Sequence, residues 1–139
     1  MQISKIEEPR VIKGDNSIDT RGVIRHVNNF DLSSIKRIYE IENISKTLKR
    51  GWKGHKIQNR WFLCSKGKIE IEVTDINFLE NKNAKYKSVI YTLEHKTFDV
   101  LYVPKGYATK IQQKETRSRV LVFADFFIDF ELDELRWEK

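Results

Sequence analysis

The sequence has few of the features that define several common protein classes. Its 139 residues include one cysteine and two prolines, and no stretch approaches the roughly 20 apolar residues that a membrane-spanning helix needs. The single cysteine, Cys64, excludes an internal disulfide and suits a reducing compartment. We therefore expect a cytoplasmic protein that has no signal peptide and does not bind membranes.

The common motifs of catalysis and nucleotide binding are absent as well. The sequence has no G-x-S-x-G, no P-loop and no G-x-G-x-x-G. No cysteine–histidine pair has zinc-finger spacing, since the only histidines are His26, His55 and His95. These absences argue against a hydrolase with a nucleophile elbow, a kinase and a zinc finger.

The composition is typical of a globular chain. Hydrophobic residues make up 40% of the sequence and charged residues 33%, and the two kinds are mixed throughout. The length suits one domain over residues 1–139, and no repeat or linker divides it.

Short runs of β-branched and aromatic residues, bounded by Gly, Asn, Asp or Lys, predict an all-β fold. Alternation is clearest where Ile69, Ile71 and Val73 share one face of a strand. Gly67, just before that strand, predicts a hairpin turn with positive φ. The expected elements are strands at 11–12, 22–28, 35–41, 51–57, 60–64, 68–74, 87–93, 99–103, 109–113 and 119–126, a loop at 77–85 and a short C-terminal helical turn within 129–137.

The net charge is +6, and the basic residues are scattered along the chain except for one cluster between Lys46 and Lys56. Such a cluster fits a solvated basic face or an anion-binding site, and the glycines and the histidine within it favour the second interpretation. A nucleic-acid-binding barrel also fits the charge and the interleaved aromatics. Acidic residues dispersed among the basic ones, and the acid-rich segment 130–139, argue against nucleic acid as a partner.

Two groups of polar residues are candidates for chemistry. On a strand, Lys53 and His55 project to one face and Trp52 to the other. A nearby cation lowers the pKa of a histidine, and a neutral imidazole is a general base, although His55 also fits an ordinary hydrogen-bonded interior histidine. Arg37 and Tyr39 likewise share a face, which suits phosphate binding and proton transfer, or a packed pair at a sheet edge.

Four segments, in this order, resemble the sugar 3,4-ketoisomerase and WxcM-like group of the RmlC-like cupins. The D-x-R-G of that group is similar to Asp19–Gly22, and its K-R-(V/I)-Y strand to Lys36–Tyr39. Its R-G-(F/W)-H-(A/G)-H-K segment resembles Arg50–Lys56, with Lys53 in place of the first histidine. Its later strand and turn resemble Tyr102–Thr109, where the residues alone also fit an ordinary turn. The resemblance implies a cupin-like jelly-roll barrel.

The resemblance also implies a function. Members of the group isomerise or epimerise nucleotide-linked 4-keto-6-deoxy sugars through an enediolate, without a cofactor, in the biosynthesis of surface polysaccharide sugars. For this chain it favours 3,4-ketoisomerisation, with His55 as base or proton shuttle, Tyr39 as the acid, and Lys53 as a stabilising cation or a substitute base. The substrate-binding residues that it suggests are Arg37, Arg50 and Arg60 for the diphosphate and Trp52 and Tyr107 for stacking.

Departures from related families narrow these expectations. Metal-binding cupins use an H-x-H pair, a carboxylate and a later histidine, and of these ligands only His55 is present here, so we expect no metal. The 3,5-epimerases of dTDP-4-dehydrorhamnose are a weaker match because Lys53 and Thr109 replace their histidines. An epimerase of that kind and a non-catalytic nucleotide-sugar-binding cupin remain alternatives. We expect a homodimer that exchanges an N-terminal strand.

Overall fold

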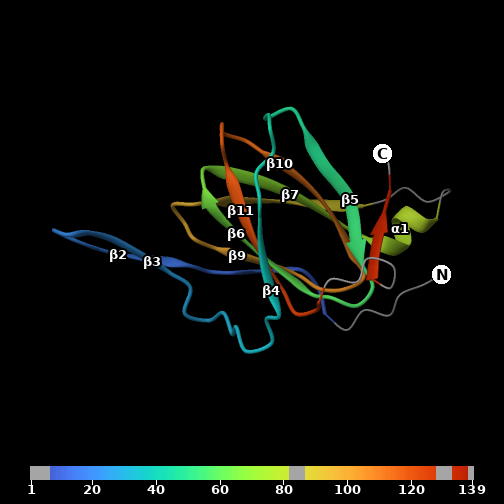
Figure 1. The fold of residues 1–139 in the computed structure, drawn as a ribbon, viewed down its shortest axis with the longest axis horizontal. Coiled ribbons are helices and arrows are strands. Elements are labelled where there is room, and N and C mark those ends of the chain that lie inside the picture. Colours follow the sequence, from blue (N-terminus) through green and yellow to red (C-terminus); the bar gives the residue numbers. More distant parts are fainter. Residues whose placement is uncertain (1–6, 82–86, 128–132, 138–139) are drawn as a thin grey trace.

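Antiparallel strands dominate the computed structural model, which describes residues 7–81, 87–127 and 133–137 (Figure 1). One five-stranded sheet has the order β1-β9-β6-β11-β4 and a second has the order β12-β5-β10-β7-β8, while β2 and β3 form a separate hairpin. The strands are β1 Arg10–Ile12, β2 Asp15–Asp19, β3 Gly22–His26, β4 Arg37–Ile41, β5 Lys49–His55, β6 Arg60–Lys66, β7 Lys68–Asp75, β8 Ser88–Glu94, β9 Val100–Val103, β10 Tyr107–Gln113, β11 Arg119–Ala124 and β12 Glu134–Arg136.

The two five-stranded sheets enclose one hydrophobic core. Phe62 and Val122 from the first sheet and Ile69 and Ile71 from the second belong to the same buried cluster. The alternation that the sequence predicts around Ile71 is therefore confirmed, because these side chains face inward between the sheets. Cys64 lies in this core, where burial raises the pKa of its thiol to about 11.

The expected strands are all present, with ends shifted by a few residues, but two elements differ from expectation. Asp15–Asp19 forms a strand, β2, that pairs with β3 in an exposed hairpin. Part of the expected loop is instead the helix α1, Ile76–Glu80. The Asp75 side chain accepts a hydrogen bond from the Asn77 amide (2.8 Å) at the start of this helix, whose Ile76 and Leu79 are buried. Residues 82–85 of the expected loop lie outside the described residues. Within the described part of the chain, no helix has the length and apolar character to span a membrane.

The turn at Gly67 has the predicted positive φ, 74°, but it does not close a hairpin. The strands on either side of it, β6 and β7, belong to different sheets. A Cβ atom at this position would collide with the side chain of Ser118, whose hydroxyl accepts a hydrogen bond from the Lys68 amide (3.1 Å). The hairpin prediction is wrong because the turn carries the chain across the core from one sheet to the other.

The C-terminal helical turn is also a wrong prediction for Glu134–Arg136, which form strand β12. This strand pairs with β5 and places Glu134 opposite His55 and Arg136 opposite Lys53. The segment is extended because β5 otherwise has an unpaired edge, and because Leu135 packs on a second buried cluster beside α1 (Figure 1). Residues 129–132 of the expected turn lie outside the described residues.

Candidate active site

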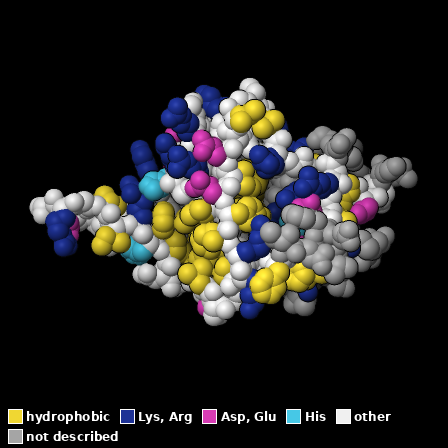
Figure 2. All heavy atoms as spheres, in the orientation of Figure 1, with side chains coloured by type: hydrophobic (Ala, Val, Ile, Leu, Met, Phe, Trp, Pro, Cys, Tyr) yellow, Lys and Arg dark blue, Asp and Glu magenta, His cyan; other side chains and the backbone are white. Residues whose placement is uncertain are grey.

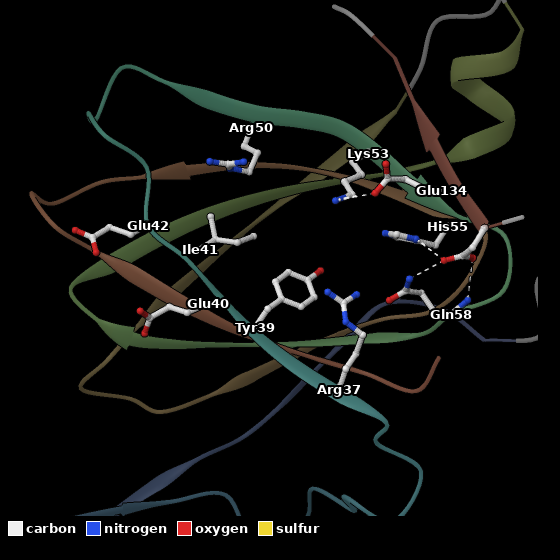
Figure 3. Close-up of a pocket in the computed structure, with 11 residues that line it drawn as sticks. Arg37, Tyr39, Glu40, Ile41, Glu42, Arg50, Lys53, His55, Gln58 and Glu134 are labelled. Atoms are coloured by element: carbon white, nitrogen blue, oxygen red, sulfur yellow. Dashed lines mark hydrogen bonds and ion pairs between the residues drawn. The ribbon is translucent and has the colours of Figure 1, made fainter. Parts of the chain in front are cut away.

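A cavity of about 350 Å³ lies between β4 and β5, at the corresponding edges of the two sheets (Figure 3). Strand β4 ends the first sheet, and β12 and β5 end the second. The lining is mostly polar and charged, so the cavity suits a charged or heavily hydroxylated ligand. Its residues are Arg37, Tyr39, Glu40, Ile41, Glu42, Arg50, Lys53, His55, Gln58, Asp133 and Glu134.

Five of the eight residues suggested by the sequence line this cavity. Arg37 and Tyr39 reach it from β4, and Lys53 and His55 reach it from β5, in each case because alternate residues share a face. Arg50 is three residues before Lys53 and would point the other way on a regular strand. The register between β5 and β10 shifts in this stretch, where Gly51 has a φ of 140°, so Arg50 joins the same wall.

The other three residues do not line the cavity. Trp52 is 1% exposed and belongs to the second buried cluster, on the opposite face of β5. Tyr107, on β10, lines a separate hollow with Tyr91. Arg60 is 3% exposed and donates a hydrogen bond from Nη1 to Oγ1 of Thr109 (3.3 Å). A ligand in this cavity would therefore not contact Trp52, Tyr107 or Arg60.

His55 and Asp133 form a buried pair at one end of the cavity. His55 Nδ1 lies 2.7 Å from Asp133 Oδ2. The same carboxylate accepts hydrogen bonds from Gln58 Nε2 (2.6 Å) and from the backbone amides of Ile57 (2.6 Å) and Gln58 (3.1 Å). Burial favours a neutral acid, but these donors outweigh it and hold the pKa of Asp133 well below its ordinary value.

An ionised Asp133 fixes the tautomer of His55. The carboxylate accepts from Nδ1–H, which leaves the lone pair on Nε2. That nitrogen is buried, has no hydrogen-bond partner among the described residues, and points into the cavity (Figure 3). Burial and repulsion from Arg60 lower the pKa of His55 to about 4, in spite of Asp133. At pH 7 His55 is therefore a neutral base directed at the cavity.

Tyr39 faces this pair from the opposite wall. Its hydroxyl points toward the end of the cavity where Lys53 and His55 lie (Figure 3). The guanidinium carbon of Arg37 lies 4.4 Å from the centre of the Tyr39 ring, and the buried Arg60 interacts electrostatically with the phenol. Burial lowers the pKa of Arg60, partly offset by Tyr39, yet an arginine keeps its charge. Tyr39 thus places a hydroxyl, which can donate or accept a proton, opposite His55.

A second ion pair lies beside the first. Lys53 Nζ is 2.9 Å from Glu134 Oε1, and Arg136 Nε is 2.7 Å from Glu134 Oε2. The Glu134 side chain is 7% exposed. Burial raises the pKa of Glu134, but the two cations outweigh it and hold the value below normal, so Glu134 is ionised.

Sequence reasoning missed the six other lining residues, which are Glu40, Ile41, Glu42, Gln58, Asp133 and Glu134. Asp133 and Glu134 belong to an acid-rich segment that resembles an ordinary solvated terminus. Their proximity to β5 follows from strand pairing across the chain, which has no local sequence signal.

Charged side chains of both signs line the cavity. Arg37, Arg50 and Lys53 bring three cations to its walls, and Glu40, Glu42, Asp133 and Glu134 bring four carboxylates. Asp133 and Glu134 are paired with His55 and Lys53, whereas Asn43 Oδ1 accepts from Arg50 Nε (3.1 Å) and holds that guanidinium in place. Among residues 7–81, 87–127 and 133–137, no group of three or more His, Cys, Asp or Glu side chains is arranged to hold a metal ion.

Several solved structures have this fold. QdtA, a sugar 3,4-ketoisomerase from Thermoanaerobacterium thermosaccharolyticum in complex with TDP, is 20% identical with a TM-score of 0.72, and the match covers 94% of this chain and 89% of QdtA. A 3,4-ketoisomerase from Helicobacter canadensis is 22% identical with a TM-score of 0.66, covering 90% and 88% of the two chains. The dTDP-4-dehydrorhamnose 3,5-epimerase from Bacillus anthracis is 16% identical with a TM-score of 0.74, covering 90% and 76%. The expected RmlC-like cupin architecture is confirmed.

Two comparisons of the sequence gave different results. A search of curated proteins found no match to the chain. The family model described as FdtA: WxcM-like, C-terminal, matches residues 7–134, which is most of the sequence. The chain belongs to the FdtA family (WxcM-like, C-terminal).

Proposed function

We propose that the chain is an isomerase that moves the keto group of a nucleotide-linked 4-keto-6-deoxy sugar from C4 to C3, without a metal or cofactor. The observation that carries the proposal is the neutral His55, held by Asp133 and facing Tyr39 across a cavity whose lining also includes Arg37 and Arg50. Members of the same fold with related chemistry support it. QdtA is a 3,4-ketoisomerase, and a mutant of QdtA was solved in complex with TDP-4-keto-6-deoxyglucose.

The first step is removal of the proton on C3, which the neighbouring 4-keto group makes acidic. His55 Nε2 accepts this proton, and the electrons of the C3–H bond form a C3=C4 double bond while O4 becomes an oxyanion. Asp133 stabilises the imidazolium that results. Tyr39 then donates its proton to O4, which gives a neutral enediol.

The second step reverses the roles at the neighbouring carbon. The phenolate of Tyr39 takes the proton of the O3 hydroxyl, the C3–O3 bond becomes a carbonyl, and C4 takes the proton held by His55. The protons balance, and both side chains return to their starting states. If Tyr39, on the opposite wall, instead delivers its proton to C3, the keto group stays at C4 and the product is an epimer, so the same residues also suit an epimerase.

The diphosphate is the natural ligand for Arg37 and Arg50. Both side chains line the cavity, and a guanidinium matches the geometry of phosphate oxygens. Arg60, which the resemblance suggested for this role, is 3% exposed and lies behind Tyr39. We assign it to the support of the Tyr39 hydroxyl rather than to the diphosphate.

A homodimer is part of the proposal. The β2–β3 hairpin extends away from the two five-stranded sheets as an arm (Figure 1), and Figure 2 shows hydrophobic side chains exposed along it. Ile18 is 75% exposed and Ile24 is 64% exposed. A second copy of the chain would cover these side chains.

The buried, single Cys64 agrees with a cytoplasmic site of action, and surface polysaccharide sugar biosynthesis is the expected pathway.

The test uses three substrates, the dTDP-, GDP- and UDP-linked forms of 4-keto-6-deoxyglucose, in D₂O. We expect NMR to show deuterium entering the sugar at C3 and C4, together with a 3-keto product, for at least one of them. Exchange at C5 would instead identify a 3,5-epimerase. Binding by calorimetry with no exchange would identify a non-catalytic nucleotide-sugar-binding protein, and the absence of both would contradict the proposal.

A further inference from the structure

The Lys53–Glu134 pair has the same construction as the His55–Asp133 pair. Lys53 and His55 are alternate residues of β5, and Asp133 and Glu134 are consecutive residues at the start of β12. Each acidic residue contacts one of the two β5 side chains, at 2.7 Å and 2.9 Å. One C-terminal strand therefore supplies the partner of both functional groups on this wall.

The surroundings of Lys53 hold its ammonium group in one place. Its Nζ lies beside an ionised Glu134 carboxylate that is nearly buried and also paired to Arg136. Moving Nζ away would leave that carboxylate with one cation fewer in a site poorly accessible to water, which costs free energy, so the pair holds the ammonium in place. The charged and titratable groups around the pair are Arg50, His55, Asp133, Glu134 and Arg136.

The position of Lys53 allows its ammonium group to stabilise negative charge in the cavity. Its side chain is 31% exposed and reaches into the cavity between Arg50 and His55 (Figure 3). An ammonium there lies on the same wall as the base that removes the C3 proton. In the proposed reaction negative charge develops on O4, next to the carbon that loses this proton, and positive charge held in advance near such a point lowers the barrier.

We infer that Glu134 is a positioning residue, which holds Lys53 as a fixed ammonium against the enediolate oxygen. The inference rests on the proposed function and deepens it, because it leaves His55 as the one base on this wall. Lys53 is then neither a substitute base nor an amine that attacks the keto group, since both of those roles need a free lone pair on Nζ.

The first experiment needs no substrate. The rate at which an amine-acylating reagent labels Lys53 is measured by mass spectrometry in the wild type and in Glu134→Gln, with the exposed Lys36 as internal reference. We expect Lys53 to be labelled several-fold faster in the variant, because its side chain is no longer held against a nearly buried carboxylate. Equal rates in the two proteins would overturn the inference even if no nucleotide sugar is turned over.

The second experiment uses turnover. Lys53→Met is expected to lower kcat by about 10²–10³-fold, as for the loss of one oxyanion donor, while Lys53→Arg retains part of the activity. Glu134→Gln is expected to lower kcat with little change in KM. Glu70→Gln is the matched control, because it removes a lysine–glutamate pair, with Lys114, away from the cavity.

Two outcomes contradict the inference here. One is a Glu134→Gln variant with the kcat of the wild type. The other is a reduced adduct of substrate on Lys53 after cyanoborohydride treatment of the working wild-type enzyme, which would show that Lys53 attacks the keto group as an amine. Failure of the wild type to exchange deuterium contradicts the proposed function instead, and leaves the labelling experiment to decide the state of Lys53.

Discussion

His55 Nδ1 lies 2.7 Å from Asp133 Oδ2, although the two residues are 78 positions apart in the sequence. The pair is almost fully buried, with side-chain exposures of 4% and 2%. Asp133 orients the imidazole and fixes its tautomer, and burial keeps the ring neutral. Several predictions about activity and stability depend on this one contact.

Substitution of the base should remove exchange while leaving binding intact. In His55→Asn, a side-chain amide still donates a hydrogen bond to Asp133, but no group accepts the C3 proton. We expect the rate of deuterium wash-in to fall by about 10²–10⁴-fold. Calorimetry with TDP should give unchanged affinity, because Arg37 and Arg50 are untouched. Full exchange in this variant would show that another residue is the base.

Substitution of the carboxylate should affect both activity and stability. Asp133→Asn removes the negative charge and places an amide donor among groups that all donate, so His55 loses its preferred tautomer. We expect kcat to fall by about 10²–10⁴-fold, as in related histidine–carboxylate pairs. Urea unfolding should show a loss of about 1–3 kcal/mol in the free energy of unfolding. A stable variant with normal kcat would remove Asp133 from the mechanism.

The pH dependence follows from the direction of the pKa shifts. The pKa of His55 falls from an unfolded value of 6.5 to about 4 in the folded chain, so its contribution to stability is complete above pH 6.5 and is lost as the pH falls toward 4. Asp133 adds a loss in the same direction at lower pH. We expect kcat/KM to stay level from pH 8 to about 5 and then to decline.

The measurement for this prediction is a pH–rate profile, accompanied by urea unfolding at each pH. In His55→Asn, the part of the stability loss between pH 6.5 and 4 that comes from the imidazole should disappear. An acid limb centred near pH 6.5 in the wild type would show that His55 titrates as an exposed histidine, contrary to its buried position.

The absence of a side chain at Gly54 lets β12 and Trp137 pack closely against β5. A Cβ atom there would lie 2.8 Å from Ile76 Cδ1 and 3.1 Å from Trp137 Cζ3. We expect Gly54→Val to displace Trp137 and with it the strand that carries Asp133, costing about 1–3 kcal/mol in stability. Exchange activity should fall together with the urea midpoint. Wild-type behaviour of Gly54→Val would mean that β12 is not needed at this position.

The arm offers a test of assembly. Ile24→Glu places a charge on the exposed hairpin, and we expect light scattering to show a shift from dimer to monomer. Ile44→Glu is the matched control, because Ile44 is 95% exposed in the segment between β4 and β5. A wild type that is monomeric at all concentrations, or an Ile24→Glu variant that stays dimeric, would contradict the role proposed for the arm.

Much of the fold and one wall of the site are readable from local sequence. The period of two in a strand directs Ile69 and Ile71 to the core, and the same rule places Lys53 with His55 and separates them from Trp52. These features depend only on the pleat of an extended backbone. For this reason the strands expected from the sequence are found in the structure.

Tertiary structure alone decided the other half of the site. Asp133 and Glu134 reach β5 because a strand edge and a buried cluster accept the C-terminal segment, and no residue near them in sequence indicates that pairing. The turn at Gly67 shows the same distinction. Its positive φ is a local property, whereas the sheet that the next strand joins depends on the rest of the fold. Backbone period and turn geometry are set by neighbours in the chain. Partners 78 residues apart are set by which edges remain unpaired once the whole core has formed.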